Sequence, residues 1–284
     1  MSAPTMGTAD LLVIAKEPVA GRVKTRLTPA YTAAEAAALA EAALRDTLAA
    51  VAAARAGRRT LVLDGAPGPW LPEGFAVCAQ RGGGLDERLA HAFADVYAGR
   101  PLVLVGMDTP QVTPALLERA CAALTPAGAG SGHTAVSDYE AVSGHRAEPR
   151  HKAQPRHGAE PGHGAEPGHE AEPGHEAEPG HEAEPGCGAV SGCEAVFGGA
   201  ADGGFWLLGL RRPDAALLRG VPMSRADTGA AVLGRLRAAG LRVAELPVLR
   251  DVDTPADAAA VAADAPDGEF AAAVRALGAR TVPA

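Results

Sequence analysis

A positively charged loop near the start of the chain could bind phosphate. Within eleven residues it holds four cations, a glycine and a hydroxyl: Lys16, Gly21, Arg22, Lys24, Thr25 and Arg26. Cationic side chains and backbone N–H groups together suit an anionic phosphate chain. The loop follows the apolar run Leu11–Ala15, which is typical of a buried strand, and α/β sheets bind ligands in the loops at the carboxyl ends of their strands. This position favours phosphate binding over the alternative, a solvated basic turn.

Two acidic segments could supply a metal site. Asp108 follows the apolar run Pro101–Val105 closely, so it is expected at the carboxyl edge of the sheet rather than in the core. Asp251 and Asp253 precede a predicted helix start. Mg²⁺ and Mn²⁺ prefer hard oxygen ligands, commonly one or two carboxylates completed by phosphates and water. One of these two aspartates near Asp108 would make a two-carboxylate cation site. The alternative for Asp108 is an Asx-turn before the Thr-Pro pair that follows it.

A third acidic segment combines an aspartate with two glycines. Asp202 precedes Gly203 and Gly204, and the apolar run Phe205–Leu210 follows. Two glycines let the backbone approach a ligand closely, and the strand would anchor the turn. The same pair would suit an ordinary hairpin turn, and the residue types alone favour neither interpretation.

The sequence excludes several common enzyme classes. Outside a repeat over residues 133–192, His91 is the only histidine and the serines are Ser2, Ser131 and Ser224, so a Ser-His-Asp hydrolase is hard to assemble. The chain has no G-x-x-x-x-G-K-[ST] phosphate loop, and its first loop lacks G-x-G-x-x-G. No cysteine and histidine cluster with zinc spacing occurs outside the repeat.

The residues between these motifs predict the elements that position them. Short apolar runs bounded by turn residues predict strands over 11–15, 60–63, 75–79, 101–105, 195–197, 205–210 and 242–246. Capping residues and periodicity predict helices from the Thr32–Glu35 capping box to about Gly57, over 85–98, from Thr113-Pro114, over about 227–239 and from Thr254-Pro255. Strands separated by helices predict an α/β fold with a mainly parallel sheet covered on both faces. We expect a flexible N-terminus of residues 1–9 and one domain formed by residues 10–132 and 193–284.

Residues 133–192 interrupt this alternation with a hexapeptide repeat. Alanine occupies the third position of every unit, and the next unit in phase, at 193–198, overlaps the following predicted strand. The central units are rich in Pro, Gly and Glu, a composition that predicts a disordered low-complexity insertion. Metal binding by the seven histidines spaced six residues apart, from His145 to His181, is disfavoured because single histidines without fixed geometry bind weakly.

Charge and hydropathy restrict the partners and the location. The net charge is −8, but residues 133–192 carry eleven acidic and four basic side chains, so the remaining chain is nearly neutral. A nucleic-acid partner is not expected, because phosphate-backbone binding needs a concentrated basic face. The N-terminus has no positive region before an apolar run, and no apolar stretch reaches the ~18–20 residues that span a bilayer. These features predict a cytoplasmic protein without a membrane span.

Five segments of the chain resemble the DUF2064 family in both content and order. They are AKEPVAGRVKTRL, QRGGGLDERL, VGMDTP, AADGGFWLLGL and DVDTPAD. The resemblance covers residues 10–277 apart from the repeat. Members of this family are also called selenodomain-associated transferase 1 or arsenosugar-biosynthesis-type glycosyltransferases. The family is similar to GT-A glycosyltransferases and, more distantly, to nucleotidylyltransferases, which implies a GT-A-like (Rossmannoid) fold.

The resemblance also implies roles for individual residues. Arg22, Lys24 and Arg26 would contact nucleotide phosphates, and Lys24 and Arg26 would neutralise charge on the leaving group. Asp108 and Asp253 would bind the metal, and Asp202 would face the acceptor as a general base. Two further nucleotide-binding residues are implied by the segment after the third predicted strand: Gln80 and Arg88. That family segment usually reads G-D-L-G-x-R, whereas here it reads GGLDER and acquires Asp86.

The function that these expectations imply is a Mg²⁺- or Mn²⁺-dependent transferase. It would use a nucleotide-activated small-molecule donor, foremost a nucleotide sugar, and an acceptor that the motifs do not identify. One alternative is a nucleotidylyltransferase that moves NMP from an NTP to a phosphorylated or carboxylated acceptor and releases pyrophosphate. A second alternative is a catalytically inactive nucleotide-binding regulator, for which the altered GGGLDER segment would be the sign.

Overall fold

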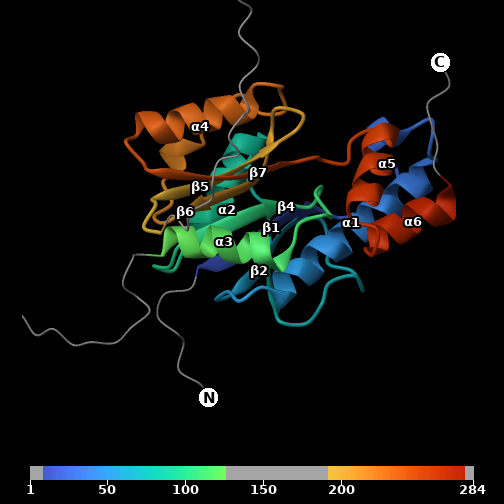
Figure 1. Cartoon of the computed structure of the whole chain (residues 1–284), viewed down its shortest axis with the longest axis horizontal. Helices are drawn as coiled ribbons and strands as arrows, with labels where there is room; N and C mark the ends of the chain where they lie inside the picture. The colour runs from blue at the N-terminus through green and yellow to red at the C-terminus, as the bar shows by residue number, and fades with distance from the viewer. Residues whose placement is uncertain (1–8, 126–190, 279–284) are drawn as a thin grey trace, which may run out of the picture. The chain divides into compact units, whose positions relative to one another are not determined.

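A seven-stranded sheet lies at the centre of the fold in the computed structural model, which describes residues 9–125 and 191–278 (Figure 1). Its strands are β1 (Asp10–Lys16), β2 (Arg59–Asp64), β3 (Phe75–Ala79), β4 (Leu102–Gly106), β5 (Ala195–Ala200), β6 (Phe205–Leu210) and β7 (Val243–Leu249). They are ordered β3-β2-β1-β4-β6-β5-β7, and among them β6 alone runs antiparallel to its neighbours. The prediction of a mainly parallel sheet is therefore confirmed.

Six helices connect or follow these strands in the described residues. They are α1 (Ala33–Ala53), α2 (Leu85–Val96), α3 (Pro114–Leu124), α4 (Thr228–Ala238), α5 (Pro255–Asp264) and α6 (Glu269–Leu277), with two short 3-10 turns, η1 (Thr25–Leu27) and η2 (Ala215–Leu217). The capping box of Thr32 and Glu35 opens α1 as predicted. This helix ends at Ala53, before Gly57, because the backbone of Ala54 is already extended.

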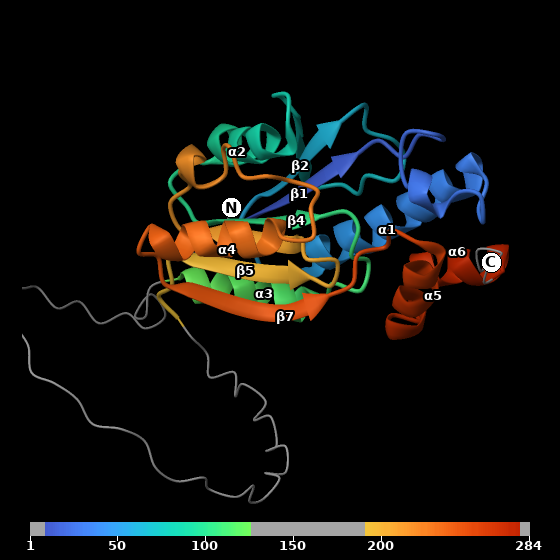
Figure 2. The ribbon, with the colours of Figure 1, turned by 90° about the horizontal axis from the view of Figure 1, so that it is seen from above.

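Helices cover both faces of the sheet, as the alternation of strands and helices predicts. Leu11 and Val13 of β1 pack with residues of α1 and α3, whereas Leu12 between them packs with residues of α2 and α4. Successive side chains of a strand point to opposite faces, so one apolar run fills two cores. Figures 1 and 2 show α4 and α3 on opposite sides of the sheet. The described residues thus form one α/β domain.

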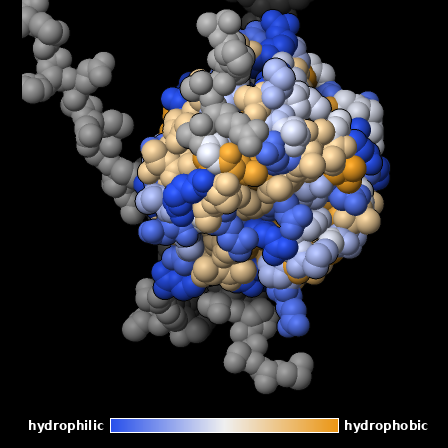
Figure 3. Space-filling view, turned by 90° about the vertical axis from the view of Figure 1, so that its right-hand side faces the viewer, coloured by the Kyte–Doolittle hydropathy of each residue, from blue (hydrophilic) through white to orange (hydrophobic). Residues whose placement is uncertain are grey.

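The last two helices pack on the first half of α1 rather than on the sheet (Figure 2). The Asp46 carboxylate of α1 accepts hydrogen bonds from the N–H groups of Glu269 and Phe270, both at 2.9 Å, and so caps α6. Hydrophilic and hydrophobic residues are interspersed over this side of the molecule (Figure 3). No helix in the described ranges is long and apolar enough to cross a membrane.

The chain leaves α3 and returns to β5 at one point of the fold. The Gly192 N–H donates to the Thr125 carbonyl at 3.0 Å, and the Cys193 N–H donates to the Ala123 carbonyl at 2.9 Å. The unit at 193–198, which is in phase with the repeat, runs into β5 as expected. The predicted insertion over 133–192 otherwise lies outside the described residues, as do residues 1–8 of the predicted flexible N-terminus. The last residue of that N-terminus, Ala9, is buried.

The segment Asp202-Gly203-Gly204 is a hairpin turn between β5 and β6. One of the two interpretations left open by the sequence is therefore correct at the level of the backbone. The hairpin also makes β6 antiparallel, so β6 begins at the edge where the parallel strands end. The loops after β1, β2, β3, β4, β5 and β7 all emerge at this carboxyl edge.

Candidate functional site

The loop after β1 directs Lys24 toward the carboxyl edge of the sheet. Val23 and Leu27, which flank it, are buried in the core. Lys24 itself adopts the left-handed conformation with φ 48° and opens η1, where its carbonyl accepts a 2.9 Å hydrogen bond from the Leu27 N–H. Two apolar anchors thus fix the backbone, and the side chain between them projects into the site.

The Lys24 ammonium connects two loops that are far apart in the sequence. Its Nζ lies 2.6 Å from Oδ1 of Asp108 and 3.3 Å from Oδ1 of Asp253. The Lys24 side chain is only 6% exposed. Burial alone would lower the pKa of Lys24, but the charges of Asp108, Asp253 and Asp251 outweigh this effect and hold the pKa above its usual value. Lys24 is therefore a buried cation with two direct carboxylate partners.

Arg26 approaches the same carboxylate from the solvent side. Its guanidinium lies 3.1 Å from Oδ2 of Asp253, and its side chain is 70% exposed. Asp253 is therefore held between a buried and an exposed cation. An exposed ion pair contributes little to stability, so Arg26 keeps its freedom to engage an anionic ligand.

The aspartates after β4 and β7 are brought together by backbone pairing of their loops. The Val252 N–H donates to the Asp108 carbonyl at 2.9 Å, and the Gln111 side-chain amide donates to the Arg250 carbonyl at 2.7 Å. Val252 is buried, and its neighbours Asp251 and Asp253 both line the cavity. Thr254, the expected helix start, forms the capping box of α5 with Asp257, which leaves Asp251 and Asp253 available to the site.

Asp251 is the site residue that the sequence named without assigning a role. Its Oδ1 is buried and has no hydrogen-bond partner within the described residues. Burial, followed by the charges of Asp108 and Asp202, raises the pKa of Asp251 to about 7. The D-x-D spacing around an apolar residue is the signal that could have identified it, because alternate residues of an extended segment point to one side.

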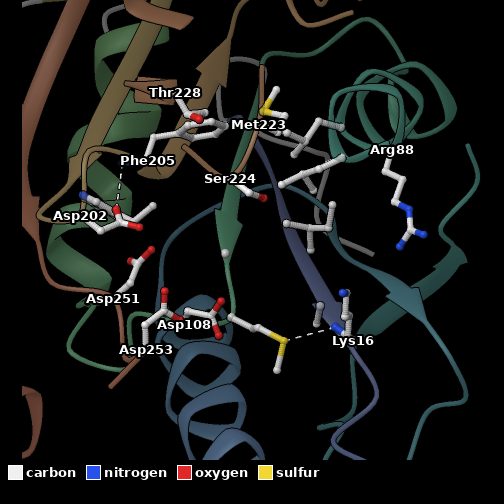
Figure 4. Close-up of a pocket in the computed structure, with 18 of the residues that line it drawn as sticks. Lys16, Arg88, Asp108, Asp202, Phe205, Met223, Ser224, Thr228, Asp251 and Asp253 are labelled. Carbon is white, nitrogen blue, oxygen red and sulfur yellow. Dashed lines mark hydrogen bonds between the residues drawn. The ribbon is translucent and has the colours of Figure 1, made fainter. Parts of the chain in front are cut away.

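The β5–β6 hairpin holds Asp202 on the same side of the cavity as the other three aspartates (Figure 4). Its Oδ1 accepts a 2.8 Å hydrogen bond from the Gly204 N–H. Gly203 has φ 87°, and a Cβ there would overlap the carbonyl oxygen of Ala226. The glycines therefore serve the turn and its close packing, and they also place Asp202 near the site.

These side chains surround one cavity of about 810 Å³ at the carboxyl edge. The predicted site residues that line it are Lys16, Arg22, Lys24, Thr25, Arg26, Gln80, Arg88, Asp108, Asp202 and Asp253. Gly21 does not line it, because it sits in a left-handed turn (φ 77°) earlier in the loop. Asp86 also lies outside: its carboxylate accepts a 2.8 Å hydrogen bond from the Gly220 N–H, which lowers the pKa of Asp86.

Gln80 and Arg88 are fixed on the opposite side of the cavity from the aspartates. The Gln80 amide donates to the carbonyls of Ala15 and Val62, at 2.7 and 3.1 Å. Arg88 donates to Asp64 at 3.0 Å. Figure 4 shows Lys16 and Arg88 facing the aspartates across the cavity.

A third wall of the cavity comes from residues that the sequence left nearly unassigned. Phe205, Met223, Ser224 and Thr228 line it (Figure 4). Ser224 adopts the left-handed conformation with φ 58°. Thr228 holds this loop by donating to the Pro222 carbonyl and accepting from the Arg225 N–H, at 2.9 and 3.0 Å. The wall is partly apolar, in contrast to the acidic side.

The acidic side of the cavity fits a divalent metal by its chemistry. Asp108, Asp251 and Asp253 offer hard carboxylate oxygens, and the unpartnered Oδ1 of Asp251 is an unused ligand atom. Within the described residues, however, no three acidic, histidine or cysteine side chains are already grouped closely enough to hold a metal ion. The Lys24 ammonium lies between two of these carboxylates instead. The residues therefore fit a Mg²⁺- or Mn²⁺-type ion if Lys24 moves.

One solved structure with a similar fold is that of a candidate nucleotide-diphospho-sugar transferase from Desulfovibrio desulfuricans G20. It has a TM-score of 0.64 and 22% identity, covering 96% of this chain and 97% of that one. This likeness shows a shared fold and confirms the GT-A-like prediction. Rv0371c of Mycobacterium tuberculosis, in complex with manganese, has a TM-score of 0.43 and 19% identity (90% and 97% covered). CMP:2-keto-3-deoxy-manno-octonic acid synthetase, in complex with CTP, has a TM-score of 0.42 and 12% identity (90% and 97% covered).

Curated proteins offer no significant match to this chain. A family model does match, over residues 31–138 and 186–225, which together are just over half of the sequence. Its description reads "uncharacterized protein conserved in bacteria (DUF2064)". The matched ranges include Asp108, Asp202 and the segment with Gln80 and Arg88. The chain therefore belongs to the DUF2064 family.

Proposed function

We propose that this protein is a metal-dependent transferase that uses a nucleotide-activated donor, and that the donor is a nucleotide sugar. One observation carries the proposal: carboxylates from three loops and the cations of the β1 loop meet in a single cavity at the carboxyl edge of the sheet. A nucleotide diphosphate needs both kinds of group, because its charge must be neutralised by cations and by a carboxylate-bound metal.

The proposal gives each part of the cavity a partner in such a donor. Arg22, Lys24 and Arg26 would contact the diphosphate, and Lys16, Gln80 and Arg88 on the opposite side would contact the nucleoside. Asp108 and Asp253, with Asp251 as a third carboxylate, would hold the metal. The metal would supply Lewis-acid stabilisation of the charge that develops on the leaving diphosphate.

The acceptor would bind near the β5–β6 hairpin. Asp202 projects from this turn beside Phe205 and faces the cavity with Met223 and Ser224. In an inverting reaction the Asp202 carboxylate would take the proton of the acceptor hydroxyl as that oxygen attacks the sugar. The fold shared with a candidate nucleotide-diphospho-sugar transferase is consistent with this reaction.

A second candidate function is nucleotidyl transfer from an NTP. The observation that favours it is the density of cations on one loop, where Lys24 and Arg26 both engage Asp253 while Lys16 and Arg22 also line the cavity. This positive charge would suit a triphosphate as well as a diphosphate. Pyrophosphate would then be the leaving group in place of a nucleoside diphosphate.

A product assay separates these functions. Purified protein with Mg²⁺ or Mn²⁺ is incubated with panels of nucleotide sugars and NTPs, and the release of nucleoside diphosphate and of pyrophosphate is measured. Nucleoside diphosphate released from a nucleotide sugar is the expected result. Release of pyrophosphate from an NTP would contradict glycosyl transfer and support nucleotidyl transfer. Binding of nucleotide without release of either product would indicate a nucleotide-binding regulator.

The Asp108→Asn variant tests the site in the same assay. We expect metal-dependent turnover to fall by about 10²-fold or more, because loss of a ligand should cost at least as much as loss of a group that only orients one. Asp264→Asn is the matched control, since it removes the same charge from an exposed position of α5. Equal activity of the two variants would show that Asp108 takes no part in metal-dependent turnover.

A further inference from the structure

The Lys24 ammonium occupies the place where a metal ligated by Asp108 and Asp253 would lie. Its Nζ is 2.6 Å from Oδ1 of Asp108 and 3.3 Å from Oδ1 of Asp253, so it sits between the two oxygens. The side chain is only 6% exposed, whereas Asp108 and Asp253 are 41% and 31% exposed. The carboxylates thus open to the cavity while the cation between them is enclosed.

An ammonium and a divalent ion cannot share this position. Mg²⁺ binds oxygen at about 2.0–2.1 Å, so an ion held by these carboxylates would compete with Nζ for the same oxygens. Even a neighbouring position would bring three positive charges into a partly buried site, where Coulomb repulsion is screened less than in water. Competition for the same oxygens and repulsion between the charges therefore both favour departure of Lys24 when a metal binds.

The backbone of the loop allows the side chain to move while its base stays in place. Val23 and Leu27 on either side are buried, and the Lys24 carbonyl accepts a hydrogen bond from the Leu27 N–H. Arg22, Thr25 and Arg26 line the same cavity. If the Lys24 side chain leaves the carboxylates, its backbone therefore stays in place. Its ammonium then remains near the other cations of the loop, in the cavity where a ligand would bind.

We propose that Lys24 is a resident cation that the divalent metal displaces, and that the released ammonium binds the phosphates of the donor. This inference rests on the proposed metal-dependent function. A buried ammonium that lost both carboxylates without a new anionic partner would be costly. Metal and phosphate therefore enter together, and the protein without nucleotide binds the free metal weakly.

Binding of Mn²⁺ tests the exchange without any turnover. Free Mn²⁺ is titrated by electron paramagnetic resonance against the wild-type protein and the Lys24→Gln variant, with and without inorganic pyrophosphate as the phosphate probe. Lys24→Arg keeps the positive charge in the site, and Arg55→Gln removes one from an exposed pair with Glu118. Thermal melting of each variant checks that it is folded.

We expect Lys24→Gln to bind free Mn²⁺ at least tenfold more tightly than wild type, because its competing cation is gone. Lys24→Arg and Arg55→Gln should retain the weak wild-type affinity. Pyrophosphate should strengthen Mn²⁺ binding to the wild type at least tenfold. Its effect on Lys24→Gln should be much smaller, because glutamine has no positive charge to bind the phosphate groups.

Two results would overturn the inference, and they differ in what else they overturn. If Lys24→Gln binds free Mn²⁺ no more tightly than wild type, while pyrophosphate still promotes Mn²⁺ binding, the exchange is wrong and the metal site stands. If no variant binds Mn²⁺ with or without pyrophosphate, the metal-dependent function is wrong and the exchange falls with it.

Discussion

At the scale of single residues, the acidic side of the cavity holds four carboxylates and one enclosed cation. Asp108, Asp202, Asp251 and Asp253 all line the cavity, and Lys24 is the enclosed cation among them. Asp251 should have the largest effect on how stability depends on pH. Burial and then its acidic neighbours raise its pKa to about 7, above the ordinary value of 3.8. Deprotonation of Asp251 therefore favours the unfolded state, and its contribution to stability falls as pH rises from about 4 to about 7.

Replacing Asp251 by asparagine should stabilise the protein at high pH. The variant removes a charge that the folded state tolerates poorly, so we expect a gain of at least about 1 kcal/mol at pH 8, roughly 2–4 °C in melting temperature. At pH 4 the two proteins should melt nearly together, because Asp251 is then mostly protonated when folded. The measurement is thermal melting without added metal. A constant difference across pH, or one that matches Asp264→Asn, would contradict this account of Asp251.

At the scale of elements, the β5–β6 hairpin and the loop before α4 act as one unit. A Cβ at Gly203 would meet the Ala226 carbonyl oxygen, and a Cβ at Gly229 would meet that of Gly204. The Gly229 N–H also donates to the Gly203 carbonyl at 2.8 Å. Backbone packed directly on backbone leaves no side chain that can yield, so the positions of Asp202 and Ser224 depend on each other.

Gly203→Ala should therefore disturb both walls of the cavity. The new methyl group overlaps a backbone oxygen at a residue with φ 87°, so we expect a loss of about 2 kcal/mol or more of unfolding free energy, together with weaker turnover. Gly234→Ala is the control, because Gly234 lies within α4 with no atom close to an added Cβ, where alanine should stabilise by about 0.5–1 kcal/mol. Denaturant unfolding measures both. A neutral Gly203→Ala would show that the turn is not tightly packed.

At the scale of the whole molecule, the described residues on either side of 126–190 lie next to each other. Thr125 after α3 and Gly192 before β5 are joined by a hydrogen bond, and the sheet and cavity are assembled from the segments on either side. Asp108 comes before the repeat, whereas Asp202, Asp251 and Asp253 come after it. The two halves of the site therefore meet through the sheet, in which β4 pairs with β6.

Deletion of residues 133–192 should leave the fold and the activity largely intact. Residues 126–132 remain and can join Thr125 to Cys193, whose N–H still pairs with Ala123. We expect the melting temperature to change by no more than a few degrees and turnover by less than about twofold, because surface loops can be shortened at small cost in free energy. Thermal melting and the product assay measure these values. A deletion variant that fails to fold would show that the repeat belongs to the domain.

The local pattern of the sequence was sufficient for the elements and for most of the residues that line the candidate cavity. Strands such as β1 and β4 follow from their short apolar runs, and helix starts follow from Thr32, Thr113 and Thr254, since capping depends on residues three apart. Placement of Lys24, Asp108 and Asp253 at one edge follows from the rule that parallel strands end together. The end of α1 was predicted less accurately, because no residue type near Ala54 indicates that the backbone there is already extended.

Only the tertiary structure decided how the site residues meet. Lys24 and Asp253 are separated by 229 positions, and no pattern in the sequence reveals that the lysine lies between two carboxylates. The burial of Asp251 and the docking of Gly203 on Ala226 depend likewise on the packing of distant loops. Residue types and spacing determine which chemistry is available, because they set local structure and charge. Distances and burial, which decide pKa and the competition between cations, arise only when remote segments pack together.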